Sequence, residues 1–375
     1  MSRHTSPPGP LGLTLAEYAA ARRTHPQAVR SDYTRLMRAA DGVTLPAPTR
    51  CERDGEVVKF CLPAGTHAGR PLESESVLIP MHSYRSTDWY TLCVSSQVGC
   101  RMGCTFCETG RMGLLRNLSA EEIVRQRLVA RQLLSGPIPT ARPFRYFGDA
   151  VQNIVFMGMG EPFDNFDNVI QAIRVLNEPR GLDFPLTQIT ISTVGRIDGL
   201  RRLAALRRDR DWPNLRLAIS LNAPNDALRE ALMPINKGMP LADLQRALRE
   251  YPLARKGRYL IEYVLIKDVN DAPEHADAVA AWCRPLPCIV NLIPYNPQRD
   301  AAYETPSDAN VLRFLRRLRA QGVFVKRRIS YGRDLMGACG QLGNPEVRRR
   351  PASAPPLPHS AGWPGSITSS RPLGS

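Results

Sequence analysis

The sequence of 375 residues contains no long hydrophobic run. Its longest apolar stretches, such as residues 154–159, have the length of a buried strand, whereas a membrane-spanning helix needs about 20 apolar residues. The N-terminal stretch MSRHTSPPGP also lacks the apolar segment of a secretory signal. We therefore expect a cytoplasmic protein that does not enter a membrane.

Acidic residues are scarce relative to basic ones. The chain has 35 Asp and Glu against 50 Lys and Arg, which gives a formal net charge of +15. This charge favours a polyanionic partner such as nucleic acid, and a basic surface that is merely solvated is the alternative. Basic residues are concentrated in the segments 201–208, 313–319 and 326–328, which could follow a phosphate backbone.

The nine cysteines form an odd-numbered, clustered set in a chain without a recognisable export signal. This pattern indicates metal or redox chemistry and not a disulfide framework. A lone cysteine is usually a small buried hydrophobe, and we assign that role to Cys51, Cys61, Cys283 and Cys288. Cys339 differs, because its glycine-flanked segment Gly337-Ala338-Cys339-Gly340 suits an exposed, reactive thiol.

Composition divides the chain into disordered ends at 1–10 and 346–375, a small N-terminal α+β accessory domain at 11–85 and a main domain at 86–345. The ends are rich in Pro, Ser, Gly and Arg and have no periodic apolar face, and the C-terminal tail is rich in Pro and Arg. The accessory domain is indicated by a capping box at Thr14 and Glu17 and by the apolar run 57–62, for which 75–79 is a candidate partner strand.

In the main domain, β-rich runs alternate with helical patterns, which predicts an α/β fold with a parallel sheet or barrel. The runs are 92–95, 154–157, 189–193, 215–221, 259–266, 289–293 and 323–329. Helices between them are marked by signals such as the capping box of Ser119 and Glu122 and by Gly322 after the apolar periodicity of 308–321. In such folds, functional residues collect at the carboxyl ends of the strands.

Three cysteines, Cys100, Cys104 and Cys107, lie within eight residues in the glycine-containing segment GCRMGCTFC, directly after the first of these strands. Thiolates at this spacing suit zinc or an iron–sulfur cluster. A structural zinc site normally has four ligands, whereas a cluster held by three cysteines leaves one iron open for another ligand.

The cysteine segment resembles that of radical S-adenosylmethionine (SAM) enzymes, and four further motifs narrow the resemblance. SSQVGCRMGCTFCETGRMGLLRNL, NIVFMGMGEP, SLNAPND, NLIPYNP and ACGQL resemble, in this order, the RlmN/Cfr-type RNA adenosine methyltransferases. The similarity covers approximately residues 70–345. It implies a partial (β/α)6 radical SAM barrel, a 4Fe–4S cluster and SAM.

The resemblance also implies roles for individual residues. Cys100, Cys104 and Cys107 would hold the cluster, and SAM contacts would come from Gly160, Glu161, Ser192, Ser220, Leu221, Asn222 and Asn296. From the residues alone, Gly158 and Gly160 would let a ligand approach the backbone, but a tight turn is an alternative reading. Asn222 stands where family members usually have His, and it can still donate and accept hydrogen bonds.

In the family, a cysteine matching Cys339 receives a methyl group from one SAM, and a radical from a second SAM activates that methyl for addition to the adenine ring. The resemblance implies that Cys93 then releases the product by forming a disulfide and that Glu75 is the proton acceptor. It also implies RNA as substrate, ribosomal before transfer RNA and carbon 2 before carbon 8, and an electron donor such as flavodoxin or ferredoxin. We expect a monomer.

Two other functions are compatible with the residues. One is a radical SAM enzyme that modifies a peptide or a small molecule, which would need neither RNA affinity nor the pair Cys93 and Cys339. The other is a non-catalytic RNA-binding protein with a zinc or iron–sulfur site.

Overall fold

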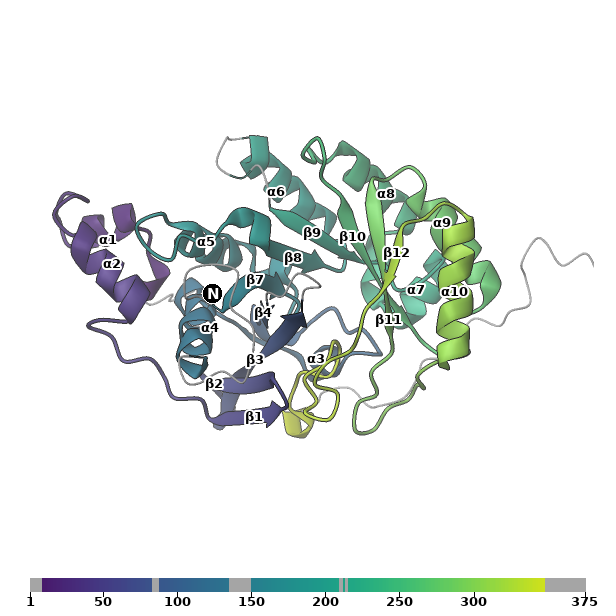
Figure 1. Cartoon of the computed structure of the whole chain (residues 1–375), viewed down its shortest axis with the longest axis horizontal. Coiled ribbons are helices and arrows are strands. Elements are labelled where there is room, and N and C mark those ends of the chain that lie inside the picture. The colour runs from purple at the N-terminus through teal and green to yellow at the C-terminus, as the bar shows by residue number, and fades with distance from the viewer. Residues whose placement is uncertain (1–8, 83–87, 135–149, 209–211, 213–214, 348–375) are drawn as a thin grey trace, which may run out of the picture.

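The computed structural model describes residues 9–82, 88–134, 150–208, 212 and 215–347 (Figure 1). The expected disordered ends lie outside the described residues except at their inner limits. There, Pro10 and Glu346 belong to the short 3-10 helices Pro10–Gly12 and Pro345–Val347.

The main domain is built on parallel strands that alternate with helices, as the sequence predicts. The strands are β4 (Asp88–Cys93), β7 (Val151–Phe156), β8 (Ile189–Thr193), β9 (Arg216–Ser220), β10 (Tyr259–Leu265), β11 (Cys288–Pro294) and β12 (Val325–Arg327). Neighbours in this order are hydrogen-bonded to one another and parallel. Because β12 is an edge strand, the sheet stays open, which confirms the expected partial α/β barrel with one parallel strand added beyond β11.

Helices follow the strands because their apolar faces pack onto the sheet. They are α4 (Ala120–Leu133), α5 (Phe166–Asn177), α6 (Ile197–Arg208), α7 (Asp226–Leu232), α8 (Leu241–Glu250), α9 (Pro273–Cys283) and α10 (Asp308–Ala320), with 3-10 helices at Pro162–Asn165, Leu186–Gln188 and Pro234–Gly238. The predicted capping box at the start of α4 is present, since the Ser119 hydroxyl accepts a hydrogen bond from the Glu122 backbone N–H at 3.2 Å. The sequence also predicts that Gly136 and Pro137 end this helical segment, and both residues lie outside the described ones.

The N-terminal strands extend the same sheet. β1 (Arg50–Asp54), β2 (Val57–His67) and β3 (Arg70–His82) are antiparallel, and β3 pairs with β4 so that Val77 faces Cys93. Within the described residues the sheet has ten strands, from β1 at one edge to β12 at the other. At the expected domain boundary near residue 85, therefore, the pairing changes from antiparallel to parallel without a break in the sheet. A separate accessory domain at 11–85 stays a prediction.

Two short helices, α1 (Leu15–Ala21) and α2 (Arg30–Ala39), precede the sheet and lie beside α5 at one end of the molecule (Figure 1). The capping box of Thr14 and Glu17 begins α1 as predicted. The hydroxyl of Thr34 in α2 donates a hydrogen bond to the carbonyl of Arg180 at 2.7 Å, beyond the end of α5. No helix in the described ranges is long and apolar enough to cross a membrane.

A small hairpin follows β4 and carries the three-cysteine segment. It consists of β5 (Gln97–Cys100) and β6 (Gly113–Asn117), with the short helix α3 (Glu108–Met112) between them. The chain after β12 returns to this region and passes α3 (Figure 1), where the hydroxyl of Thr109 donates to the carbonyl of Leu342 at 2.5 Å. The segment after β12, which carries Cys339, is thus in contact with the hairpin that carries the three-cysteine segment.

Candidate active site

A cavity, here called the central cavity, opens at the carboxyl ends of β7 to β11. It is lined by Phe156 at the end of β7, Ser192 in β8, Ser220 in β9 and Ile293 in β11. Its other polar and sulfur-bearing lining residues include Cys100, Cys104, Cys107, Glu161, Glu262 and Cys339. The cavity therefore lies at the edge of the sheet where parallel α/β folds bind ligands.

The three cysteines of the cysteine loop, residues 100–107, face this one cavity. Backbone contacts hold the loop in place, because Thr105 N–H donates to the carbonyl of Leu232 at 3.0 Å and its hydroxyl lies 2.8 Å from that of Tyr303. Gly110 packs so tightly against the loop that a Cβ there would lie 2.8 Å from the carbonyl oxygen of Cys104. The loop conformation thus depends on close backbone contact that a larger residue would prevent.

The surroundings of these thiols fit an iron–sulfur cluster. Burial raises the pKa of all three, to about 12 for Cys104, and a neighbouring cysteine raises the pKa of Cys100 and Cys104 further. Thiolates at these positions need positive charge at the centre of the cavity, which cluster irons would supply. In the described part of the chain, no three His, Cys, Asp or Glu side chains form a compact group that could hold a single metal ion.

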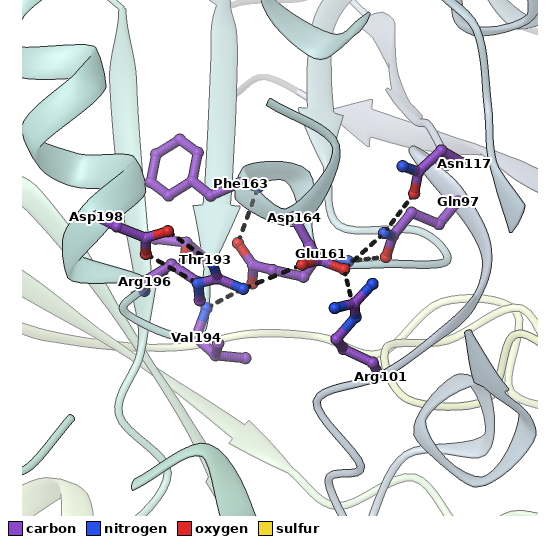
Figure 2. A network of polar contacts seen from close by, with 10 residues as sticks. All are labelled: Gln97, Arg101, Asn117, Glu161, Phe163, Asp164, Thr193, Val194, Arg196 and Asp198. Carbon is purple, nitrogen blue, oxygen red and sulfur yellow. Dashed lines mark hydrogen bonds and ion pairs between the residues drawn. The ribbon is translucent and has the colours of Figure 1, made fainter. Parts of the chain in front are cut away.

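Glu161 joins the ends of β7 and β8 beside the cavity (Figure 2). Its carboxylate accepts hydrogen bonds from the backbone N–H of Val194 at 2.9 Å and of Phe163 at 3.1 Å. Burial raises the pKa of Glu161 to about 7, although these hydrogen bonds act in the opposite direction. Because a carboxylate can accept several hydrogen bonds, Glu161 retains capacity for a ligand amine.

A wider polar network holds this turn against the hairpin (Figure 2). Gln97 of β5 accepts from Glu161 N–H at 2.9 Å and donates to Asn117 of β6 at 2.8 Å. Asp164 forms ion pairs with Arg101 in the cysteine loop and with Arg196 after β8, each at 3.0 Å. The network therefore couples the cysteine loop to the turns that follow β7 and β8.

Most of the expected SAM-contacting residues meet at the central cavity, which is lined by Gly160, Glu161, Ser192, Ser220 and Asn222. Gly160 has a φ of +101°, and a Cβ there would lie 2.5 Å from the Cβ of Gln97, so glycine is required. Asn222 also stabilises the fold, because its side-chain oxygen Oδ1 accepts a hydrogen bond from Val264 N–H at 2.9 Å.

Two of the expected contacts lie elsewhere. The side chain of Leu221 is fully buried in the hydrophobic core and does not line the central cavity. Asn296 lies beside the Cys339 segment, where its amide donates to the Cys339 carbonyl at 3.2 Å and accepts from Arg333 at 2.8 Å. In the described residues, Asn296 therefore supports the thiol-bearing loop.

Cys93 and Cys339 line a second cavity, which we call the thiol chamber. Its lining residues include Ile79, Cys93, Met157, Asn296, Arg328 and Cys339. Cys339, Met157 and Ile293 line both cavities, so the chamber adjoins the central cavity at Cys339. The structure thus brings together the pair that the sequence singles out, although Cys93 lies on β4 and Cys339 in the loop after β12.

Glu75 lines neither the central cavity nor the thiol chamber, and its role as proton acceptor stays a prediction. It is 2% exposed and lines a separate cavity with Arg50, Lys59 and Met336. Its carboxylate pairs with the Lys59 ammonium at 2.9 Å, and the same ammonium donates to the Met336 carbonyl at 3.1 Å. The pair therefore supports the Cys339 segment from behind.

Sequence reasoning did not place three charged residues at the site, and it assigned one of them, Arg328, to a basic segment that could follow a phosphate backbone. Glu262 lines the central cavity and Arg328 the thiol chamber, while Arg229 is fully buried and donates to the carbonyls of Val194, Ser220 and Leu221. Glu262 had a signal, since a lone carboxylate inside the apolar run YLIEYVLI is costly to bury without a role.

The comparisons with known proteins agree with this geometry. The profile described as "Radical SAM superfamily" matches residues 94–279, which include the cysteine loop and the strands up to α9. A crystal structure of a radical SAM methyltransferase from Sphaerobacter thermophilus superposes with a TM-score of 0.77 at 35% identity, over 88% of this chain and 98% of that one.

Similar sequences include a probable dual-specificity RNA methyltransferase RlmN 1 from Protochlamydia amoebophila, 44% identical over 79% of this chain and 76% of that protein. A dual-specificity RNA methyltransferase RlmN from Anaeromyxobacter dehalogenans is 43% identical over 75% of this chain and 72% of that protein. With these similarities and the three-cysteine cavity, the chain belongs to the RlmN family of radical SAM methyltransferases.

Proposed function

We propose that the enzyme methylates a ring carbon of an RNA adenosine, carbon 2 in preference to carbon 8, through a methylated Cys339. The position of Cys339 carries this proposal, because it lines both the cavity of the three cluster cysteines and the chamber that holds Cys93. The names of the relatives, which describe RNA methyltransferases, support RNA as the substrate.

The family implies a 4Fe–4S cluster and SAM, which together supply a 5′-deoxyadenosyl radical when bound. Cys100, Cys104 and Cys107 would hold the cluster, and Gly160, Glu161, Ser192, Ser220 and Asn222 would surround SAM in the central cavity. Cys339 would carry the methyl group as a thioether at the boundary between the two cavities.

Cys93 would complete turnover after the methylene carbon has bonded to the adenine ring, the ring hydrogen has left as a proton and one electron has returned to the electron donor. Its sulfur forms a bond to the Cys339 sulfur while the bond between that sulfur and the methylene carbon breaks. The electron pair of the broken bond stays on the carbon, which takes up a proton to become the methyl group of the product. A thiol reductant restores the cysteines, and another SAM then supplies the methyl group for the next turnover.

We further propose ribosomal RNA as the first substrate and transfer RNA as the second, with flavodoxin or ferredoxin as the electron donor. The enzyme would act as a monomer in the cytoplasm, where these RNAs are found. The net charge of +15 supports an RNA partner over a peptide or a small neutral molecule.

The test uses anaerobically reconstituted enzyme, methyl-deuterated SAM, a reductant and separated ribosomal and transfer RNA. We expect labelled methyladenosine whose methyl group has lost one deuterium, because the radical step removes one hydrogen. Mass spectrometry of the nucleosides reads this out. A fully deuterated methyl group would contradict the Cys339 route, and deoxyadenosine without labelled RNA would contradict the RNA substrate.

Cysteine variants test the relay independently. Cys339→Ala should abolish methyl transfer while the iron and sulfide content stays unchanged, because Cys339 is not a cluster ligand. Cys93→Ala should instead accumulate a covalent protein–RNA adduct, visible by gel electrophoresis. Cys51→Ala is the matched control and should turn over normally, because the Cys51 thiol on β1 is exposed and not buried as the sequence predicts.

A further inference from the structure

Arg328 is a charged residue that lines the thiol chamber and also approaches the wall of the central cavity. Its backbone N–H donates to the carbonyl of Leu292 at 2.9 Å, which fixes the residue beside β11. Its guanidinium Nη1 lies 3.6 Å from the Met157 sulfur and 3.8 Å from the carboxylate oxygen Oε2 of Glu262. Arg328 therefore reaches from the thiol chamber to the wall of the central cavity.

Glu262 gives this guanidinium a fixed partner. It is 4% exposed on β10, and its other oxygen, Oε1, accepts a hydrogen bond from the Asn291 amide at 2.8 Å. Within the described residues, Oε2 of Glu262 accepts no hydrogen bond, and its charged neighbour is the Arg328 guanidinium at 3.8 Å. The carboxylate is thus oriented by Asn291 and directed toward Arg328.

The titratable groups around the two thiols come from several elements. Cys93 on β4, Arg328 after β12 and Tyr331 share the thiol chamber with Cys339. On the other side, the central cavity contributes Glu161, Glu262, Tyr295 and the cluster cysteines Cys100, Cys104 and Cys107.

Burial raises the pKa of Cys93 to about 12, with a further increase from Cys339, while Arg328 lowers it. For Cys339, burial raises the pKa, Arg328 lowers it and Glu262 raises it. The pKa of Arg328 changes correspondingly. Burial lowers it, but Cys339, Glu262 and Cys93 together raise it above the ordinary value. The guanidinium thus offsets the cost of forming a thiolate at both positions.

We propose that Arg328 is the shared cationic partner that stabilises the thiolates of Cys339 and Cys93, and that Glu262 is a positioning residue that holds Arg328 between them. The inference rests on the proposed function for the use of these thiols, since one must be a thiolate to accept a methyl group and the other to attack a sulfur atom. Arg328 favours whichever of the two must carry the charge.

The test measures thiol ionisation directly and needs no RNA. Anaerobically reconstituted enzyme without added SAM is alkylated with iodoacetamide over a range of pH, and each cysteine is followed by peptide mass spectrometry, which also quantifies methylated Cys339. In Arg328→Met, the midpoint of alkylation should rise by about one pH unit for both Cys339 and Cys93. Arg328→Lys should restore most of the shift, because it returns the charge.

Two internal controls separate charge from damage to the fold. Cys51, an exposed thiol on β1, should keep its midpoint in every variant. Arg327→Met is the matched control variant, because Arg327 is the sequence neighbour of Arg328 and pairs with Asp308 at 2.5 Å on the surface. Unchanged midpoints of Cys339 and Cys93 in Arg328→Met, or equal shifts in Arg327→Met, would overturn the inference.

Glu262→Gln tests the positioning of Arg328 and decides the matter if Arg328→Met does not fold. The amide keeps the shape of the side chain but removes the negative charge that pairs with Arg328. Cys93 reports the loss of positioning, because Arg328 lowers its pKa whereas Glu262 is not among the groups that shift it. The Cys93 midpoint should therefore rise, and a Cys93 midpoint that stays constant or falls would count against the assignment.

The same samples distinguish this inference from the proposed function. If the midpoints shift as expected but labelled RNA does not appear, the charge pairing stands and the RNA methyltransferase assignment fails. If RNA is methylated through Cys339 but the midpoints do not move, the function stands and the role of Arg328 fails.

Discussion

Hydrogen bonds from Glu108, at the start of α3, and from Gln298, after β11, connect the cysteine loop and its end to the loop that carries Cys339. The backbone N–H of Glu108 donates to the Gly340 carbonyl at 2.8 Å, and the Gln298 amide donates to the carbonyls of Phe106 and Gly340. These contacts involve the residues next to the reactive cysteines and not their sulfur atoms. The thiols are therefore held in position while their chemistry stays available.

The buried pair of Lys59 and Glu75 supports the Cys339 loop, and removing one partner should be costly. Glu75→Gln leaves the Lys59 ammonium, which is 6% exposed, without its carboxylate, so we expect a loss of about 3–5 kcal/mol in the free energy of unfolding. The double variant Lys59→Met/Glu75→Leu should recover most of this loss, because no buried charge remains. Urea denaturation of the three chains measures both effects.

The same double variant tests what Glu75 does in the reaction. If Glu75 only supports the loop, the double variant should retain methyl transfer to RNA. A stable double variant with an intact cluster but no methyl transfer would return Glu75 to the role of proton acceptor that its sequence context suggests.

At the residue scale, the sequence predicts a site whose residues are close in the chain, but it does not predict contacts between residues that are far apart in the chain. Cys100, Cys104 and Cys107 are evident because one loop carries all three. The approach of Arg328 to Glu262 is not evident, because β11 lies between β10 and β12 in the sheet and only the folded register brings their side chains together. Glu75 is predicted from a motif alone, and the fold places it in a cavity separate from that of the cluster cysteines, so its role as proton acceptor stays a prediction.

Among the elements, helix α4 positions the end of β4 through one buried side chain. Gln126 is fully buried; its Oε1 accepts from Ser76 Oγ at 2.7 Å and from Ser95 N–H at 2.8 Å, and its Nε2 donates to the Ser95 carbonyl at 2.9 Å. Ser95 in turn donates its hydroxyl to the Glu75 carbonyl at 2.6 Å. The helix thus fixes the segment between Cys93 and the cysteine loop.

Gln126→Ala should therefore destabilise the protein by about 2–3 kcal/mol, because it leaves buried polar groups of β3 and of the segment after β4 without partners. Gln132→Ala, at an exposed position on the same helix, is the matched control and should change stability by less than about 0.5 kcal/mol. Thermal or urea unfolding compares the two variants. Equal stabilities would show that the hydrogen bonds around Ser95 do not position β4.

Elements with a strong apolar period were predictable, and elements built on glycine were not. Each β-rich run of the main domain became a strand, because alternation with helices leaves few other ways to bury those side chains. The hairpin of β5 and β6 went unpredicted. Its pairing depends on Gly99, whose φ of +73° and close approach to the Gly113 carbonyl have no apolar signature.

For the whole molecule, composition indicates a partner but does not locate its binding surface. Part of the basic charge is already compensated, since Arg202 pairs with Asp167, Arg317 with Asp277 and Arg327 with Asp308. Arg328, expected among the surface residues, turns inward to the thiols. The basic residues free to meet RNA are therefore fewer than the sequence suggests, and those on α10 include Arg313 and Arg316.

RNA binding should depend steeply on salt, because each phosphate contact releases counterions. With about six to ten contacts, affinity should fall by roughly 10³–10⁵ between about 50 and 200 mM salt. Arg313 and Arg316 are exposed, and within the described part of the chain neither forms an ion pair. The double variant Arg313→Gln/Arg316→Gln should therefore lower the slope of log affinity against log salt by about one to two. Arg317→Gln is the matched control, because Asp277 at 2.7 Å already neutralises that charge, and its slope should stay near that of the parent. Binding titrations of the three proteins at several salt concentrations decide the question. A slope near zero in the parent would instead identify a substrate without a phosphate backbone, and an equal effect of Arg317→Gln would show that α10 does not contact RNA.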